Sequence, residues 1–254
     1  MLLALLAGAL IGLVLGLVGG GGSILAVPLL VYVVGVASPH AAIGTAAIAV
    51  ALNALLGLAG HWRAGTVKWR CAGVFTLTAV IGAALGAELG KAVDGARLLA
   101  LFGALMVVIG LLMLKGRTTL PLPDVRLTRE TARELLPRLA PAGLIVGLMA
   151  GFFGIGGGFL IVPALLAATH MPMRNAIGSS LVAVTALGLT TATSYAVSGY
   201  VDWQIAGLMV LGGAAGAALG IAAGRALAGK KRTLEIGFAL IVIAIGVYII
   251  VHSL

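Results

Sequence analysis

Two glycine-rich segments carry the pattern in this sequence that is best suited to binding a solute. Gly19 to Gly22 precede Ser23, and Gly154 through Gly158 surround Ile155. Glycine runs between apolar stretches can interrupt a helix and leave the first N–H groups of the next half-helix without helical partners. Such a terminus carries about half a positive charge and binds anions. The residues predicted to bind substrate here are Gly20, Gly21, Gly22, Ser23, Gly156, Gly157 and Gly158.

Hydroxyl and amide side chains in two apolar runs form a second predicted group. Thr45 and Asn53 lie eight residues apart and share one face of a helix. Ser179, followed by Ser180, occupies the position in the second half that Thr45 occupies in the first. We expect a hydroxyl from each half to face a shared substrate cavity, with hydrogen bonding between helices or to the preceding turn as the alternative.

Packing is the alternative interpretation for all the glycines. The pairs Gly82/Gly86 and Gly216/Gly220 have the small-xxx-small spacing that lets two helices approach closely, and we interpret them as helix contacts.

Ionisable residues are rare inside the apolar runs. No Lys or Arg lies away from the run ends, so an anion would be held by backbone dipoles and hydroxyls. Glu88 could relay protons, but its position three residues before Lys91 favours an interfacial ion pair. No catalytic cluster or metal-ligand spacing occurs, so we expect no enzyme activity, metal or cofactor.

The composition predicts an all-α integral membrane protein. Hydrophobic residues make up 61% of the 254 residues and charged residues 9%, against about 25% charged in soluble domains. The basic residues behind the net charge of +9 lie in short connecting segments, which argues against nucleic-acid binding. The first apolar run lacks the basic residues of a cleaved signal peptide and is expected to remain in the membrane. The apolar runs cover about residues 2–18, 24–36, 41–60, 71–90, 98–114, 139–154, 158–169, 175–197, 203–224 and 233–251.

The two sets of five runs are related as a repeat. GGSILAVP at 21–28 aligns with GGGFLIVP at 156–163, and AIGT at 42–45 aligns with AIGS at 176–179. We therefore predict a first repeat at 1–114, a polar linker at 115–138 and a second repeat at 139–254. The runs at 24–36 and 158–169 are shorter than a spanning helix of about 20 residues, which predicts glycine-broken helices or hairpins. The sequence leaves open whether about ten segments all cross the membrane or some re-enter.

Basic residues decide the expected topology. If each half crosses an odd number of times, all of the 16 Lys and Arg residues except Lys91 and Arg97 fall on one side. The positive-inside rule then predicts a cytoplasmic linker, both termini outside, and repeats of inverted topology.

The motifs GGGGSILAVPLL at 19–30 and GIGGGFLIVPAL at 154–165, with AIGT and AIGS downstream, resemble the TauE/SafE family of sulfite exporters. The resemblance covers nearly the whole chain, although Ser23 stands where the second motif has Gly158. It implies a multi-pass permease of the cytoplasmic (inner) membrane, embedded in lipid and exporting sulfite or an organosulfonate by alternating access. Uptake of another small organic anion, such as a carboxylate, and a membrane enzyme of sulfur metabolism are the alternatives, and homo-oligomerisation is left open.

Overall fold

A computed structural model describes residues 1–18, 20–115, 127–128, 130–154, 156–226 and 231–253. Within these ranges every regular element is helical, which confirms the predicted all-α class. The elements are α1 (Leu2–Val18), the 3-10 segment η1 (Gly20–Leu25), α2 (Ala26–Pro28), the π-helical segment η2 (Leu29–Val34), α3 (Pro39–Arg63), α4 (Trp69–Ala92), α5 (Gly95–Lys115), α6 (Ala132–Phe153), α7 (Gly158–Thr169), α8 (Met173–Val197), α9 (Trp203–Ala226) and α10 (Lys231–Ser253).

Six helices among the described residues are long and apolar enough to cross a membrane, namely α3, α4, α5, α6, α8 and α9. Shorter apolar helices occupy 2–15, 22–34, 158–169 and 236–252. The outward faces are apolar as well: Leu77, Ile81 and Leu85 of α4 are each more than half exposed. Lipid tails can cover such a surface, whereas water would be a poor solvent for it. The chain is therefore a multi-pass membrane protein.

Helices α4 and α6 pack side by side through glycines on their facing sides. A methyl group on Gly82 or Gly86 would collide with the backbone of α6, and one on Gly147 would collide with the backbone of α4. Helices α1 and α9 pack in the same way, because a methyl group on Gly216 would collide with the backbone of Ala9. The packing role predicted for Gly82, Gly86 and Gly216 is confirmed.

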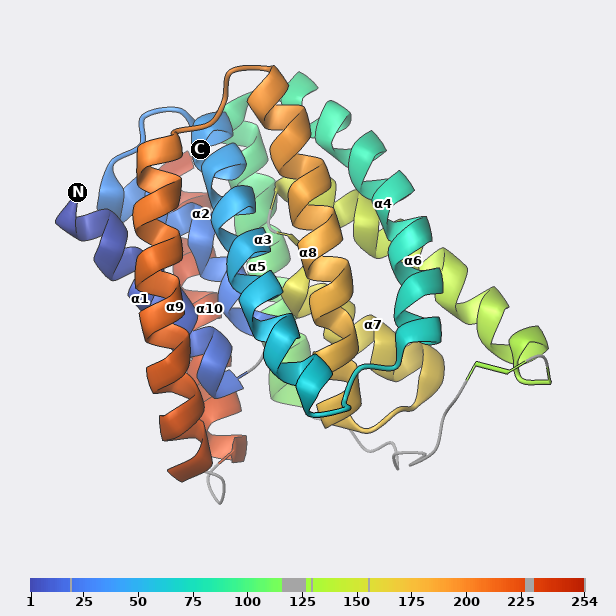
Figure 1. The fold of residues 1–254 in the computed structure, drawn as a ribbon. Helices are drawn as coiled ribbons and strands as arrows, with labels where there is room; N and C mark the ends of the chain where they lie inside the picture. The colour runs from blue at the N-terminus through green and yellow to red at the C-terminus, as the bar shows by residue number, and fades with distance from the viewer. Residues whose placement is uncertain (19, 116–126, 129, 155, 227–230, 254) are drawn as a thin grey trace.

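Helices α3 and α8 form the centre of the bundle. They pack against each other, and each also packs against one of the outer pairs, α3 against α9 and α8 against α4. Figure 1 shows α3 and α8 between α9 on the left and α4 and α6 on the right. Helix α5 packs against α10. Helices α3 and α8 therefore contribute side chains to the middle of the bundle.

The glycine break of the second half is a sharp turn between two helices. Helix α6 ends at Phe153, and Gly154, Gly156 and Gly157 all have left-handed backbone conformations, with φ of 64°, 60° and 68°. Left-handed φ costs an L-residue about 1–2 kcal/mol, so glycine is favoured here. The turn brings the chain back into the bundle as α7, which begins at Gly158.

The corresponding segment of the first half takes a different form. It runs as η1, α2 and η2, and its first described glycine with a positive φ is Gly35, at 83°. Pro28 has no N–H to donate, and the π-helical segment η2 starts at the next residue, Leu29. The two breaks predicted from similar motifs thus differ in backbone geometry.

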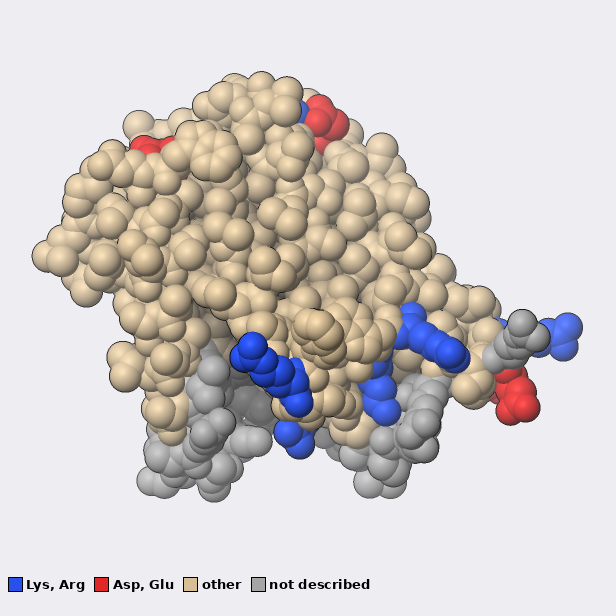
Figure 2. All heavy atoms as spheres, viewed as in Figure 1, with Lys and Arg blue, Asp and Glu red and all other residues tan. Residues whose placement is uncertain are grey.

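Hydrogen bonds show which helix ends lie together at each of the two ends of the bundle. At one end, Arg70 Nη1 donates to the Leu127 carbonyl (3.3 Å), and Asn175 Nδ2 donates to the Thr66 carbonyl (2.9 Å). At the other end, Lys91 Nζ donates to Ser198 Oγ (3.1 Å). Figure 2 shows most of the visible Lys and Arg side chains at the lower end of the molecule, while the N and C labels lie in the upper half of Figure 1.

Helix α6 begins at Ala132, inside the segment predicted as linker. Thr128 and Thr131 stabilise this start, because each backbone N–H donates to the hydroxyl of the other residue, at 2.9 and 3.3 Å. Reciprocal capping of this kind supplies acceptors for N–H groups that a helix start leaves unpaired. Of the remaining linker, residues 116–126 and 129 lie outside the described residues.

Candidate functional site

The two glycine breaks meet at the centre of the bundle. Ser23 of η1 and Gly158, the first residue of α7, line the same small, partly open space. These two residues are equivalent in the repeat alignment, so each half contributes the same position to one site. The space is too narrow to admit a water molecule. Its other lining residues are apolar: Leu15, Val50, Ala54, Leu181 and Val184.

The glycines of the second break face the central helices. An ideal Cβ on Gly156 would lie 3.0 Å from Cγ1 of Val50 in α3 and 3.7 Å from Cγ1 of Val184 in α8. Gly157 precedes α7 and accepts hydrogen bonds from Leu160 and Ile161, both at 2.9 Å. No side chain caps the start of α7. The two N–H groups before these, of Gly158 and Phe159, lie at the helix start, where an α-helix offers no acceptor and an anion can bind.

The glycines of the first break lie against α1. An ideal Cβ on Gly22 would lie 2.7 Å from the backbone nitrogen of Leu15 and 2.8 Å from the carbonyl oxygen of Ile11. This contact gives Gly22 a packing role whatever else it does. Gly20 and Gly21 begin η1, and their surroundings fall outside the described residues.

Thr45 and Ser179 make equivalent hydrogen bonds at opposite ends of the bundle. Thr45 Oγ1 accepts from the backbone N–H of Asp202 (3.0 Å), and Ser179 Oγ accepts from the backbone N–H of Lys68 (2.9 Å). Both hydroxyl residues are fully buried, and each bond joins one half of the chain to the other. Asp202 and Lys68 directly precede α9 and α4. The structure thus gives each hydroxyl a hydrogen bond to the other half of the chain, and a substrate role for the two residues stays a prediction.

Ser180 and Asn53 are not among the described residues that line the central space, although their neighbours Leu181 and Ala54 are. Ser180 is buried, and its Oγ donates to the Ile177 carbonyl in its own helix (2.8 Å). Asn53 lies against Gly213 of α9, whose ideal Cβ would be 2.8 Å from Asn53 Oδ1. Within the described part of the chain, that buried oxygen has no hydrogen-bond partner.

Polar clusters at the two ends of α3 and α8 were missed by the sequence analysis. At one end, His61 Nδ1 lies 2.8 Å from Thr66 Oγ1, next to Asn175. At the other end, the ring of His40 lies 5.4 Å from that of Tyr200 and 6.3 Å from that of Tyr195. The alignment that pairs Thr45 with Ser179 also pairs His61 with Tyr195 and Thr66 with Tyr200. Comparing polar residues at aligned positions would have found these clusters.

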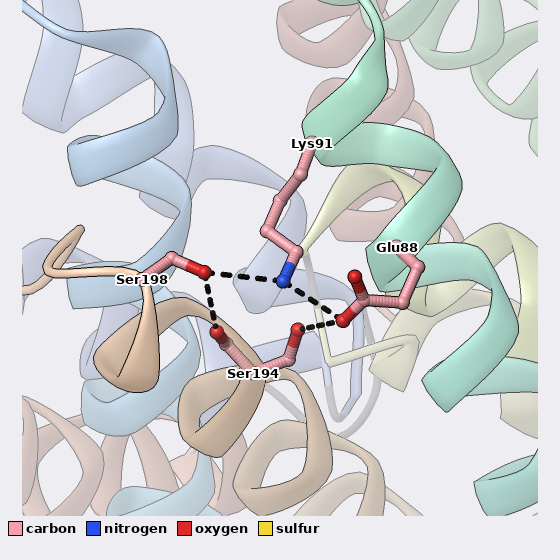
Figure 3. Close-up of polar contacts among 4 residues, drawn as sticks. All are labelled: Glu88, Lys91, Ser194 and Ser198. Atoms are coloured by element: carbon pink, nitrogen blue, oxygen red, sulfur yellow. Dashed lines mark hydrogen bonds and ion pairs between the residues drawn. The ribbon is translucent and has the colours of Figure 1, made fainter.

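Glu88 forms the ion pair with Lys91 that its spacing favours, so this prediction is confirmed (Figure 3). The Glu88 carboxylate lies 2.8 Å from Lys91 Nζ and accepts a hydrogen bond from Ser194 Oγ (2.9 Å). Lys91 also donates to Ser198, so the cluster ties the end of α4 to the end of α8. Among the described residues, no group of three or more His, Cys, Asp or Glu side chains could hold a metal ion.

Comparison with known proteins gives a match over nearly the whole chain. The model of the family described as sulfite exporter TauE/SafE matches residues 4–249. A probable membrane transporter protein of Xylella fastidiosa is 50% identical over 246 residues, which cover 97% of this chain and 93% of that protein. The probable membrane transporter protein YunE of Bacillus subtilis is 28% identical over 265 residues, which cover 97% of this chain and 96% of that protein. No solved structure matches the chain significantly.

Proposed function

Because the chain belongs to the sulfite exporter TauE/SafE family of membrane transporters, we propose that it exports sulfite or a small organosulfonate across the cytoplasmic membrane by alternating access. Family and relatives are transporters and not enzymes. The choice of a sulfur-containing anion rests on the description of the matching family and on the chemistry of the central site.

The observation that carries this proposal is the meeting of the two breaks at one small space between α3 and α8. Among the described residues, no Lys or Arg lines that space, whereas Ser23 and the start of α7 do. A hydroxyl and backbone N–H groups can hold an oxyanion through hydrogen bonds and the helix dipole. Without a fixed cation at the site, the anion can also be released, as turnover requires.

The proposed architecture is a pair of inverted-topology repeats with ten membrane segments. It is supported by the exchange of partners between the halves: α1 packs with α9 as α6 packs with α4. The hydrogen bonds of Thr45 and Ser179 show the same exchange. Transporters of this kind place their substrate near the midplane, at the interface of the repeats.

We further propose that the linker is cytoplasmic and that both termini lie outside. The positive-inside rule supports this orientation, because Arg63, Lys68, Arg70 and Arg174 belong to the end of the bundle that receives the linker. A membrane potential that is negative inside then favours anion export by about 2.3 kcal/mol per charge per 100 mV.

Thermal unfolding of the detergent-purified protein with a panel of anions tests the proposed substrate class. A ligand held at a hundred times its Kd adds about 2.7 kcal/mol of stability, which raises the Tm by about 5–10 °C in a chain of this size. We expect sulfite, sulfoacetate or taurine to give this rise, and sulfate, lactate and chloride to give little. A rise with lactate alone would favour carboxylate uptake and contradict the proposal.

A further inference from the structure

We propose that Val50 and Val184, referred to here as the valine pair, set the largest anion that the protein can pass. This inference rests on the proposed transport function and adds a residue-level determinant of substrate size. Val50 lies in α3 and Val184 in α8, at aligned positions of the two repeats. Both side chains are 2% exposed, and both line the small central space together with Ser23 and Gly158.

The valine pair converges on the second glycine break. The position that a Cβ would take at Gly156 lies 3.0 Å from a methyl group of Val50 and 3.7 Å from a methyl group of Val184. The two side chains therefore approach one point on the backbone of the break from two different helices. A solute held between Ser23 and Gly158 would lie next to these methyl groups, because all four residues line the same space.

The valine pair is also stiff. A β-branched side chain within a helix keeps one strongly preferred χ1 rotamer, so valine cannot swing aside as leucine or methionine can. Widening the passage then requires movement of α3 relative to α8, or of the break itself. A limit set by stiff groups discriminates by size, because a larger solute demands a larger displacement of packed helices.

The methyl groups of the valine pair are apolar, so the preference for anions comes from the neighbouring hydrogen-bond donors. The hydroxyl of Ser23 and the N–H groups at the start of α7 interact with the charged end of the solute. The valine pair contacts its remaining surface. Different residues thus determine the selectivity for size and the selectivity for charge. Changing the valine pair should alter the size limit and preserve the preference for anions.

Flux into proteoliposomes with anions of graded size tests this inference. The variants are Val50→Ala, Val184→Ala and the double replacement, with Val242→Ala as control because Val242 is fully buried in α10, outside this site. Radiolabelled sulfite, methanesulfonate and sulfoacetate form one series, and formate, acetate and lactate form the other. We expect the flux of the largest transported anion relative to the smallest to rise about tenfold in the double variant. Val184→Ile should lower the same ratio.

The outcomes separate this inference from the proposed function. If the wild-type protein moves only carboxylates, the proposed substrate is wrong, and the size ratio is read from the carboxylate series. If the wild-type protein moves sulfur anions and the ratios of both single variants and of the double variant equal that of Val242→Ala, the valine pair does not set the limit. A wild-type protein that moves neither series overturns the inference together with the transport function.

Discussion

Replacing Gly156 by alanine should reduce sulfite flux in proteoliposomes at least about tenfold, because the added methyl group would press against Val50 and approach Val184. The new Cβ would lie 3.0 Å from Val50 Cγ1, closer than ordinary van der Waals contact. It would therefore push the break away from α3 or fill the space that the solute must cross. Flux of sulfite is the measurement, with equal amounts of folded protein reconstituted.

Gly65→Ala is the matched control for this variant. Gly65 has a φ of 63°, close to the 60° of Gly156, but nothing lies within 4 Å of its ideal Cβ. Both replacements impose similar backbone strain of about 1–2 kcal/mol. Only Gly156→Ala adds a group to the proposed path. Equal flux in the two variants would mean that backbone strain, and not the site, accounts for any loss.

Replacing Gly82 by alanine should destabilise the fold by about 3 kcal/mol or more, because the methyl group would meet the backbone of Leu144 in α6. A side chain could rotate away from the new group, but a helix backbone can only move as a whole. The Tm of the purified protein should fall by about 6–12 °C. A stronger destabilisation would appear as loss of the monodisperse peak in size-exclusion chromatography.

Gly73→Ala controls for helix propensity in the same helix. Nothing lies within 4 Å of an ideal Cβ on Gly73, so alanine there should leave the Tm unchanged or raise it slightly. The same comparison can be made in the second half, because Gly216 is in close contact with α1 and Gly207 faces open space. The same contrast between Gly216→Ala and Gly207→Ala is expected. Similar Tm values for all four variants would contradict the interlocked packing.

The sequence alone predicts the helical class and the helix-contact glycines. Composition and the spacing of residues within one helix are sufficient to predict these features. Gly82 and Gly86 show their role by their spacing, and Glu88 with Lys91 does so by its single helical turn. Ser23 and Gly158 stand at aligned positions of the two glycine motifs, and the structure places them along one small space.

The sequence could not predict hydrogen-bond partners that lie far apart along the chain. The acceptors Thr45 and Ser179 bind N–H groups in the other half of the chain, and no local pattern points to Asp202 or Lys68. The different shapes of the two breaks were equally hidden. Gly22 is held against α1, whereas Gly156 and Gly157 have left-handed conformations, although their motifs are nearly the same.

Sulfite efflux from proteoliposomes under an inside-negative potential tests the central claim most directly. Vesicles loaded with sulfite and carrying the wild-type protein should release it faster than protein-free vesicles and faster than vesicles carrying Gly156→Ala. Lactate loaded in the same way should stay inside. Sulfite release at the rate of protein-free vesicles, with lactate released by the wild-type protein, would contradict the account.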